Sequence, residues 1–261
     1  MIDYFPSDSY DTEKDTPRLL LDRVLMNTRL VFMYKYVMLV LKSRRIALKG
    51  LYDRQAWASS SNVSFRLIES CGGRFHMKGL DNIRQSKGPV VFVSNHMSTL
   101  ETMVFPGIIA PVREVTFVVK ESLVKHPLFG PVMQARSPIL VSRKNLREDF
   151  EVVMKTGQEL LSKGISIVIF PQSTRKAEFV PEEFNTLGVR LAEKAGVPII
   201  PVAIKTDFWG NGKLLKDLGP IDRKKPIYIT FGKPLSVEGP LKEVHLKVID
   251  FIKENLKKWN V

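Results

Sequence analysis

A histidine and a glutamate lie five positions apart where an apolar stretch of the chain gives way to polar residues. His96 comes just after the run 90–94, whose β-branched residues are typical of a buried strand. Glu101 falls in the first turn of a predicted helix, three residues after the possible N-cap Ser98. Because histidine titrates near physiological pH it is suited to general base catalysis, and a neighbouring carboxylate could orient its ring and stabilise the imidazolium.

The pair also has a simpler interpretation, in which His96 only ends a strand and Glu101 only caps a helix. For an isolated His-x4-Glu pattern this purely structural interpretation is favoured. Residues elsewhere in the chain are needed to change the balance.

Cations follow three other apolar segments of the chain. Arg175 lies in the polar turn after the run 165–170, Arg143 ends the run 138–142, and Lys120 follows the run 115–119. Arginine can bind a phosphate through two hydrogen bonds, whereas lysine supplies a point charge. Each cation alone is more simply read as a solvated surface residue. Together, at strand ends beside His96, they predict a phosphate-binding catalytic site.

Short apolar runs alternate with longer amphipathic ones from residue 72 onward, which favours an α/β fold. We expect a mixed, largely parallel sheet flanked by helices. Strands are predicted at 74–78, 89–94, 115–119, 138–142, 165–170, 199–204 and 227–231. Helices are predicted at 100–109, 147–162, 181–195 and 242–257, after an earlier helical segment at 51–70.

Composition narrows the function classes. The single cysteine, Cys71, rules out a disulfide framework and a cysteine-based zinc site, and suits a reducing compartment. The four histidines lack ligand spacing, so no metal is expected. The chain also lacks a Gly-x-Ser-x-Gly elbow and the glycine signatures of P-loop and dinucleotide enzymes. With 40 lysines and arginines against 27 acidic residues, the net charge of +13 indicates an anionic partner.

The N-terminal part divides into two segments of opposite character. Residues 1–16 are acidic and polar, so we expect a flexible N-terminus, and they do not resemble a secretory signal. Residues 17–50 hold eight cations and one anion among many apolar side chains. These charges interrupt the segment too often for a spanning helix. We therefore interpret 17–71 as an amphipathic helical membrane-association segment, the alternative being a helix packed on the domain's own core.

Four blocks of the chain resemble, in order and spacing, those of the glycerolipid acyltransferases, and most closely the bacterial 1-acyl-sn-glycerol-3-phosphate type. The resemblance covers roughly residues 75–234. The blocks are Asn95-His96-x4-Glu101, the segment from Lys120-Glu121-Ser122-Leu123 to Ile139-Leu140-Val141-Ser142-Arg143, Phe170-Pro171-Gln172-Ser173-Thr174-Arg175, and Val197-Pro198-Ile199-Ile200-Pro201-Val202.

The resemblance implies a role for each matching residue. His96 would deprotonate the acceptor hydroxyl, which attacks the thioester of acyl-CoA or acyl-carrier protein directly, and Glu101 would orient His96. Arg143 and Arg175 would hold the acceptor's phosphate. The remaining residues assigned to substrate binding are Asn95, Lys120, Gln172, Ser173 and Thr174. The product would be phosphatidic acid, with no cofactor required. The acyltransferase domain would occupy residues 72–261, on the cytoplasmic face of the cell membrane as a peripheral or monotopic protein.

Several positions depart from the family pattern. Glu101 stands where the family usually has Asp, Gln172 and Ser173 stand for Glu and Gly, and Ser142 stands for Asp. These changes leave open a different lyso-lipid acceptor, such as a lyso-ornithine lipid or a lipid-linked glycan hydroxyl. They also leave open a catalytically inactive lipid-binding relative. A nucleic-acid-binding protein is disfavoured, because the most basic segment is strongly apolar, and no nucleic acid partner is expected.

Overall fold

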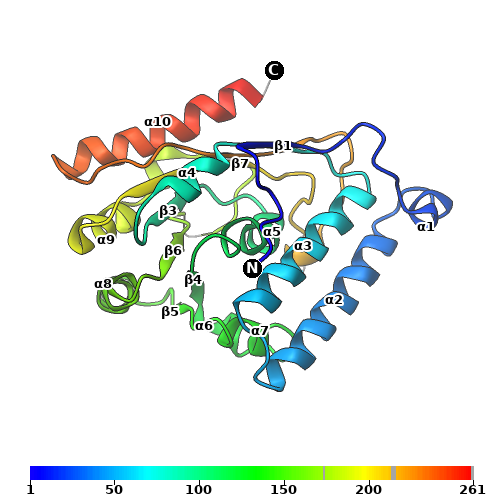
Figure 1. Cartoon of the computed structure of the whole chain (residues 1–261), viewed down its shortest axis with the longest axis horizontal. Coiled ribbons are helices and arrows are strands. Elements are labelled where there is room, and N and C mark those ends of the chain that lie inside the picture. The colour runs from blue at the N-terminus through cyan, green and yellow to red at the C-terminus, as the bar shows by residue number, and fades with distance from the viewer. Residues whose placement is uncertain (173, 213–215, 260–261) are drawn as a thin grey trace.

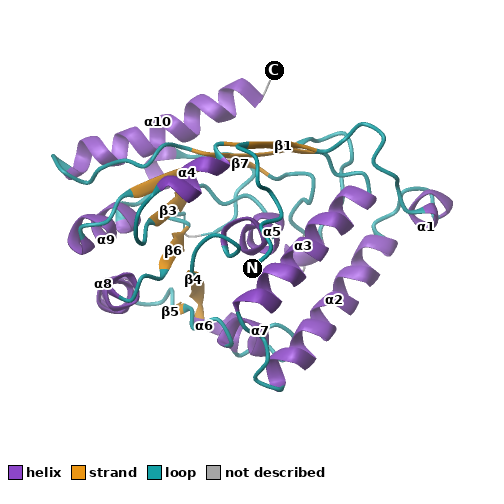
Figure 2. Cartoon of the chain, in the orientation of Figure 1, coloured by secondary structure: helices purple, strands orange, loops and turns teal. Residues whose placement is uncertain are grey.

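The computed structural model describes residues 1–172, 174–212 and 216–259, which form helices packed on both faces of one sheet (Figures 1 and 2). The strands are β1 (Ser9–Asp11), β2 (Phe75–Lys78), β3 (Val91–Ser94), β4 (Val115–Lys120), β5 (Ile139–Val141), β6 (Ser166–Ile169), β7 (Ile199–Lys205) and β8 (Ile227–Phe231). The α-helices are α1 (Leu20–Val24), α2 (Leu30–Leu48), α3 (Arg54–Ser70), α4 (Leu80–Gln85), α5 (Leu100–Ile109), α6 (Glu121–Val124), α7 (Gly130–Gln134), α8 (Leu146–Ser162), α9 (Leu187–Ala195) and α10 (Leu241–Trp259). Two short 3-10 helices are η1 (Pro181–Glu183) and η2 (Lys216–Leu218).

The sheet confirms the predicted mixed, largely parallel topology. Its strand order is β1-β2-β8-β7-β3-β6-β4-β5. The five strands from β7 to β5 run parallel to one another. Strand β8 is antiparallel to β7 and parallel to β2, and β1 is antiparallel to β2. The carboxyl ends of β3, β4, β5, β6 and β7 therefore lie along one edge of the sheet.

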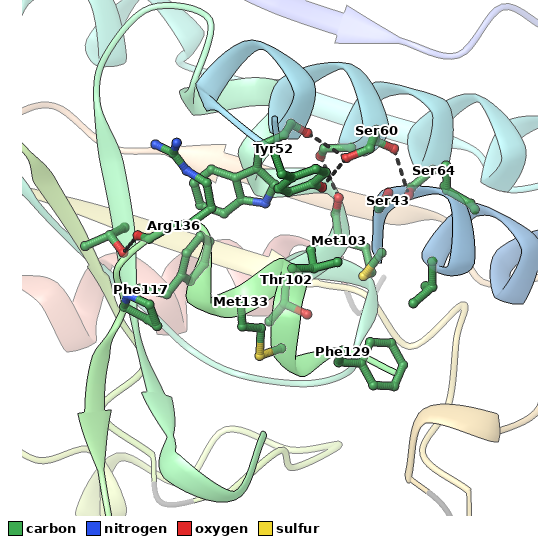
Figure 3. A pocket seen from close by; sticks show the side chains of 17 residues that line it. Ser43, Tyr52, Ser60, Ser64, Thr102, Met103, Phe117, Phe129, Met133 and Arg136 are labelled. Atoms are coloured by element: carbon green, nitrogen blue, oxygen red, sulfur yellow. Dashed lines mark hydrogen bonds between the residues drawn. The ribbon is translucent and has the colours of Figure 1, made fainter. Parts of the chain in front are cut away.

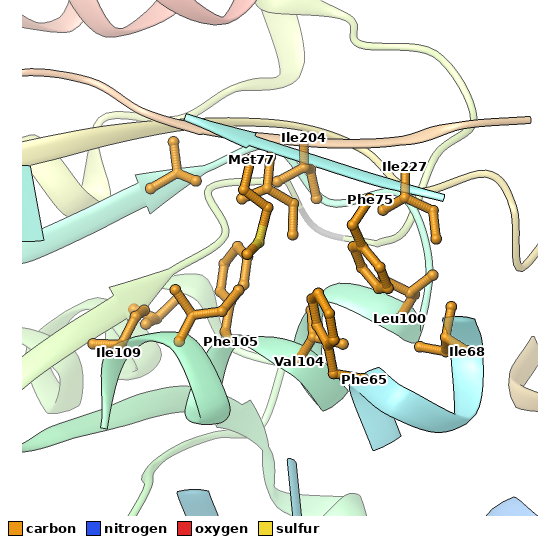
Figure 4. Packing of buried hydrophobic residues seen from close by; sticks show 14 of the residues in the cluster. Phe65, Ile68, Phe75, Met77, Leu100, Val104, Phe105, Ile109, Ile204 and Ile227 are labelled. Carbon is orange, nitrogen blue, oxygen red and sulfur yellow. The ribbon is translucent and has the colours of Figure 1, made fainter. Parts of the chain in front are cut away.

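The central strands are apolar on both sides, as expected for strands covered by helices on both faces. Alternate residues of β3 point to opposite faces: Phe92 joins one hydrophobic cluster, whereas Val91 and Val93 join the other. The first cluster includes side chains of α3 and α5 packed against β2, β7 and β8, as Figure 4 shows. The second includes side chains of α8, α9 and α10. This two-sided core fixes the position of the strand ends.

The N-terminus differs from the expected flexible segment. Strand β1 pairs with β2 along the sheet edge, and the side chain of Phe5 is 3% exposed. The hydroxyls of Tyr10 and Thr12 both donate to the buried carboxylate of Glu69, over 2.7 and 2.6 Å. The acidic composition of residues 1–16 suggested a solvated segment. The buried ring of Phe5 and the pairing of β1 with β2 instead hold this segment on the domain.

The segment 17–71 is also continuous with the domain core. Helix α3 buries Phe65 and Ile68 in the cluster with α5 and β2, so residue 72 does not separate an anchor from a domain. In contrast, α1 and the outer side of α2 expose apolar side chains to solvent. Among the described helices, none has the length and apolar content needed to cross a membrane.

Candidate active site

His96 and Glu101 meet at the carboxyl end of β3, the strand between β7 and β6. The Nδ1 atom of His96 lies 2.8 Å from Oε1 of Glu101. The histidine side chain is 12% exposed, whereas the glutamate side chain is completely buried. Because the strand ends at Ser94 and α5 begins at Leu100, the connection turns back and brings positions 96 and 101 together.

The Glu101 carboxylate is held by hydrogen bonds around both oxygens. Oε1 accepts the backbone N–H groups of Met97 and Ser98, over 2.7 and 2.8 Å, and Oε2 accepts the hydroxyls of Ser98 and Thr206, over 2.9 and 2.7 Å. Burial alone would raise the pKa of this carboxyl, but His96 and these donors outweigh it, so the pKa of Glu101 lies below its usual value. Glu101 is therefore ionised at neutral pH.

The ionised Glu101 sets the tautomer of His96. A carboxylate only accepts hydrogen bonds, so Nδ1 donates to Glu101, and in the neutral ring Nε2 is then the nitrogen that can accept a proton. The imidazole also stacks on Phe170, with ring centroids 4.2 Å apart and an interplanar angle of 20°. The ring is thus fixed in orientation by one bond and one aromatic face. This arrangement suits a general base.

Two arginines lie, like His96, at the carboxyl-terminal end of the parallel strands. Arg175 follows β6 and its side chain is 18% exposed, whereas Arg143 follows β5. Surrounding protein, and then the positive charge of Arg175, lower the pKa of Arg143, so the two guanidinium groups act on each other. The backbone of Arg143 has a φ of 57°, and Asp149 holds this turn by accepting the N–H groups of Ser142 and Arg143. Two of the three predicted strand-end cations, Arg143 and Arg175, thus lie at the carboxyl ends of β5 and β6 and are close enough to influence each other.

Two residues predicted to bind substrate have structural roles instead. The Asn95 side chain is buried, and its amide donates to and accepts from the backbone of Ile204, each over 2.9 Å, so it joins β3 to β7. Gln172 is also buried, and its Oε1 accepts the backbone N–H of His96 over 2.8 Å. Gln172 therefore positions the loop that carries the histidine. A family Glu could accept this bond as well, but it would add a second negative charge near the ring.

The other predicted substrate-binding residues have mixed outcomes. Thr174 is partly buried and lies beside Arg175, and Ser173 lies outside the described residues. Lys120 ends β4 with an exposed side chain, and in the described part of the chain no hydrogen bond or ion pair joins it to the site.

Three site residues have no counterpart in the sequence-based prediction. Thr206 follows β7 and donates to Glu101. Thr99 accepts from Arg175 and donates to Asp217 over 2.7 Å, and Asp217 also pairs with Arg175 at 2.7 Å. Thr206 follows a buried strand, so the same strand-end argument could have found it. Asp217 lies in η2 of the β7–β8 loop, where no local pattern marks it.

An apolar cavity of about 130 Å³ lies between the N-terminal helices and the sheet (Figure 3). It is lined from α2, α3, α5, β4 and α7 by residues including Leu39, Trp57, Met103, Phe117 and Met133. Phe117 connects it to the site, because its ring lies 6.4 Å from Phe170, on which His96 stacks. Within the residues that the structure describes, no cluster of three His, Cys, Asp or Glu side chains could hold a metal ion.

The region similar to known proteins contains the four sequence blocks. The family described as Acyltransferase matches residues 74–205. The chain is 31% identical to the 1-acyl-sn-glycerol-3-phosphate acyltransferase of Pseudomonas aeruginosa over 169 residues, 64% of this chain and 62% of that protein. It is 29% identical to chloroplastic LPAT1 of Arabidopsis thaliana, another protein of that name, over 61% of this chain and 40% of the relative. The matches thus span less than two thirds of each relative.

One solved structure is similar over nearly the whole chain. The 1-acyl-sn-glycerophosphate (LPA) acyltransferase PlsC of Thermotoga maritima superposes with a TM-score of 0.63 at 18% identity, covering 92% of both chains. At this identity the likeness extends to the fold.

Proposed function

The chain belongs to the acyltransferase family, and from this premise we propose that it acylates the free hydroxyl of 1-acyl-sn-glycerol 3-phosphate to give phosphatidic acid. The acyl donor is the thioester of acyl-CoA or of acyl-carrier protein. The observation that carries the proposal is the buried His96–Glu101 pair on the same sheet edge as two converging arginines. The names of the similar proteins support the choice of acceptor.

The proposed reaction is a direct transfer with His96 as the base. Nε2 of His96 accepts the proton of the acceptor hydroxyl as that oxygen attacks the thioester carbonyl carbon. A carbon–oxygen bond forms and the carbon–sulfur bond breaks with its electron pair on sulfur. The imidazolium, stabilised by Glu101, then returns the proton to the leaving thiolate. Position and a ready base suffice for a reactive thioester, so the reaction as proposed uses no covalent acyl-enzyme, metal or cofactor.

Arg175 and Arg143 bind the acceptor's phosphate in this proposal. We expect Arg175→Ala to raise the KM for lysophosphatidate at least 10-fold, because a charge-assisted hydrogen bond contributes roughly 1.5–3 kcal/mol. Arg143→Ala should act in the same direction. Initial rates with lysophosphatidate and with monoacylglycerol, which differ only by the phosphate, measure this effect with each acyl donor in turn.

A matched control for these variants is Arg147→Ala, which removes an exposed arginine from α8. It should leave the KM for both acceptors unchanged. If wild-type protein acylates monoacylglycerol and lysophosphatidate at equal rates, and Arg175→Ala changes neither rate, the proposal of a phosphate-bearing acceptor is refuted. Transfer to another lyso-lipid in the same assay would then identify the alternative.

We propose that the acyl chain of the donor binds in the apolar cavity beside Phe117. Its volume of about 130 Å³ is close to that of a cavity that holds one benzene molecule. As it stands, the cavity therefore fits one end of a fatty acyl chain. The remainder of the chain would lie along α2 toward the surface.

A membrane-binding surface is the second part of the proposal. Helix α1 and the turn after it expose Leu20, Leu21, Val24, Leu25 and Met26, and α2 adds Leu30, Tyr34 and Met38 at intervals of four residues. Exposed cations lie among them, including Arg23, Lys35 and Lys42. Such a surface inserts into the interface of an anionic bilayer.

This surface also borders the active site. Arg29, just before α2, donates to the carbonyl of Leu218, the neighbour of Asp217. The protein would thus be peripheral or monotopic on the cytoplasmic face of the cell membrane.

Surface substitution tests the membrane proposal better than truncation, because α2 also buries Phe32 and Tyr36 in the core. We expect Leu20→Ser/Leu21→Ser/Leu25→Ser to lower the fraction of protein that floats with anionic vesicles at least 5-fold. Each leucine buried in lipid contributes about 1.5–3 kcal/mol. The control triple Leu146→Ser/Phe150→Ser/Val152→Ser removes exposed apolar side chains from α8 and should float as the wild type does. Equal flotation of the two triple variants would refute the proposal that the α1 surface binds the membrane.

A further inference from the structure

The guanidinium proposed to bind the acceptor's phosphate already holds an anion from the protein itself. Nη1 of Arg175 lies 2.7 Å from Oδ1 of Asp217, and the same carboxylate oxygen accepts the hydroxyl of Thr99 over 2.7 Å. Resting on the proposed function, we propose that Asp217 is an intramolecular competitor for the phosphate at Arg175. The acceptor's phosphate displaces this carboxylate when it binds.

The contacts of Asp217 are those of an exchangeable anion. Its side chain is 35% exposed, in contrast to the fully buried Glu101, and it lies in the single turn η2 on the surface loop between β7 and β8. Among the described residues, only Nη1 of Arg175 carries hydrogen bonds to the protein. The other nitrogens of the guanidinium are left for a second anion, which can approach Arg175 before Asp217 leaves.

The charges explain which anion can displace Asp217. Arg175 and Arg143 bring two positive charges together, and Arg143 is sensitive to the charge of Arg175. The negative charge of Asp217 is also felt by the buried Tyr36: burial first, and then Asp217, raise the pKa of its phenol. The carboxylate of Asp149 also acts on Arg143, so Asp217 is the second negative charge beside this pair. A phosphate monoester carries about −1.5 to −2 at neutral pH, more negative charge than the single carboxylate of Asp217 that it would replace.

Displacement of this kind has a definite signature. When part of the protein occupies the site, the apparent dissociation constant of every competing ligand is raised by the same factor. Asp217 therefore weakens all phosphate-bearing acceptors equally and leaves neutral acceptors unaffected. Only ligands with strong intrinsic affinity, such as a phosphate monoester, then bind at useful concentrations.

The test is the substitution Asp217→Asn, which removes the charge and keeps the side-chain shape. We expect the KM for lysophosphatidate, a monoester, and for lysophosphatidylglycerol, a diester, each to fall about 5-fold, the loss of a partly exposed ion pair. The KM for monoacylglycerol should not change. A second readout is independent of catalysis: the dissociation constant of inorganic phosphate, from its protection against thermal unfolding, should fall by the same factor.

Asp207→Asn is the matched control, because Asp207 lies in the same loop but pairs with Lys205 and Lys225, each at 2.9 Å. It should change none of these constants. A raised KM in Asp217→Asn would mean that Asp217 positions Arg175, and an unchanged KM would mean that it does not compete with the phosphate. An equal effect of Asp207→Asn would mean a general charge effect. A larger gain for the monoester than for the diester would mean repulsion without exchange. Each of these results overturns the proposal.

The two proposals can fail separately. If wild-type protein does not acylate lysophosphatidate, the proposed function fails, yet the phosphate dissociation constants of the wild type and Asp217→Asn still decide the role of Asp217. If lysophosphatidate is acylated and those constants are equal, the competitor is refuted and the reaction stands.

Discussion

Replacing His96 by alanine should lower kcat for acyl transfer to lysophosphatidate by about 10²- to 10⁴-fold, the usual contribution of a positioned general base. The acceptor hydroxyl is a weak nucleophile until its proton has a destination. Nδ1 of His96 is bound to Glu101, which leaves Nε2 as the nitrogen proposed to accept that proton. The arginines proposed to bind the acceptor remain in place, so the KM should change little. Release of free thiol from acyl-CoA, followed at saturating acceptor, measures the effect.

The protein offers a matched control in His76→Ala. His76 also has a carboxylate partner, with Nδ1 2.6 Å from Oδ1 of Asp11. This pair lies on β1 and β2 at the far edge of the sheet, and both side chains are solvent-exposed. We expect the kcat of His76→Ala to stay within about 2-fold of the wild-type value, because surface substitutions have small effects. Equal kcat for wild type and His96→Ala, with both proteins folded by circular dichroism, would rule out His96 as the base.

The core of the fold was readable from sequence because its signals are local. A run that is apolar on both faces, such as 165–170, forms a buried strand in most surroundings. Helix α5 begins and ends at the predicted residues. The N-terminal strand was missed for the opposite reason. Strand β1 has only three residues, of which one is partly buried, and its place depends on pairing with β2 and on Glu69, which lies 59 residues after Tyr10. Such non-local contacts leave no pattern in the segment itself.

The candidate site divides in the same way. His96 and Glu101 are close in sequence and lie on one strand–helix connection, so spacing alone suggested their contact. The position of Arg143 and Arg175 after parallel strands, at the same end of the sheet, followed from the topology of a parallel sheet. Motif membership could not show the direction of a side chain: Asn95 turns to β7 and Gln172 turns to the backbone of His96. Asp217 enters the site from a long loop, and no rule of sequence reasoning predicts where such a loop lies.

Glu101→Gln should reduce kcat by about 10²- to 10⁴-fold, for a reason distinct from the loss of the base. A glutamine has one acceptor oxygen where the carboxylate has two, and its amide group is itself a donor. The buried site presents four further donors besides His96, from Met97, Ser98 and Thr206. The amide therefore leaves donors unpaired and no longer stabilises the imidazolium. We also expect a loss of about 3 kcal/mol in unfolding free energy at pH 7, because buried donors are left without an acceptor.

The conservative variant Glu101→Asp separates charge from length. Aspartate keeps the negative charge and is the residue usual in the family at this position, but here it is one methylene too short for a backbone arranged around glutamate. We expect a kcat between those of the wild type and Glu101→Gln. If charge were unimportant, Glu101→Asp and Glu101→Gln would be equally impaired, and kinetics of the three proteins at one pH decide the point.

The pH dependence of stability provides an independent measurement. The pKa of Glu101 is lower in the folded protein than in the unfolded chain, so the unfolded state binds the proton more readily. The stability from this carboxylate is fully present above its unfolded pKa of about 4.3 and is lost as pH falls through the lower folded pKa. The difference in unfolding free energy between wild type and Glu101→Gln should therefore shrink on acidification below pH 4. A difference that stays constant with pH, measured by urea unfolding, would show that Glu101 is not the ionised partner on which the proposed base depends.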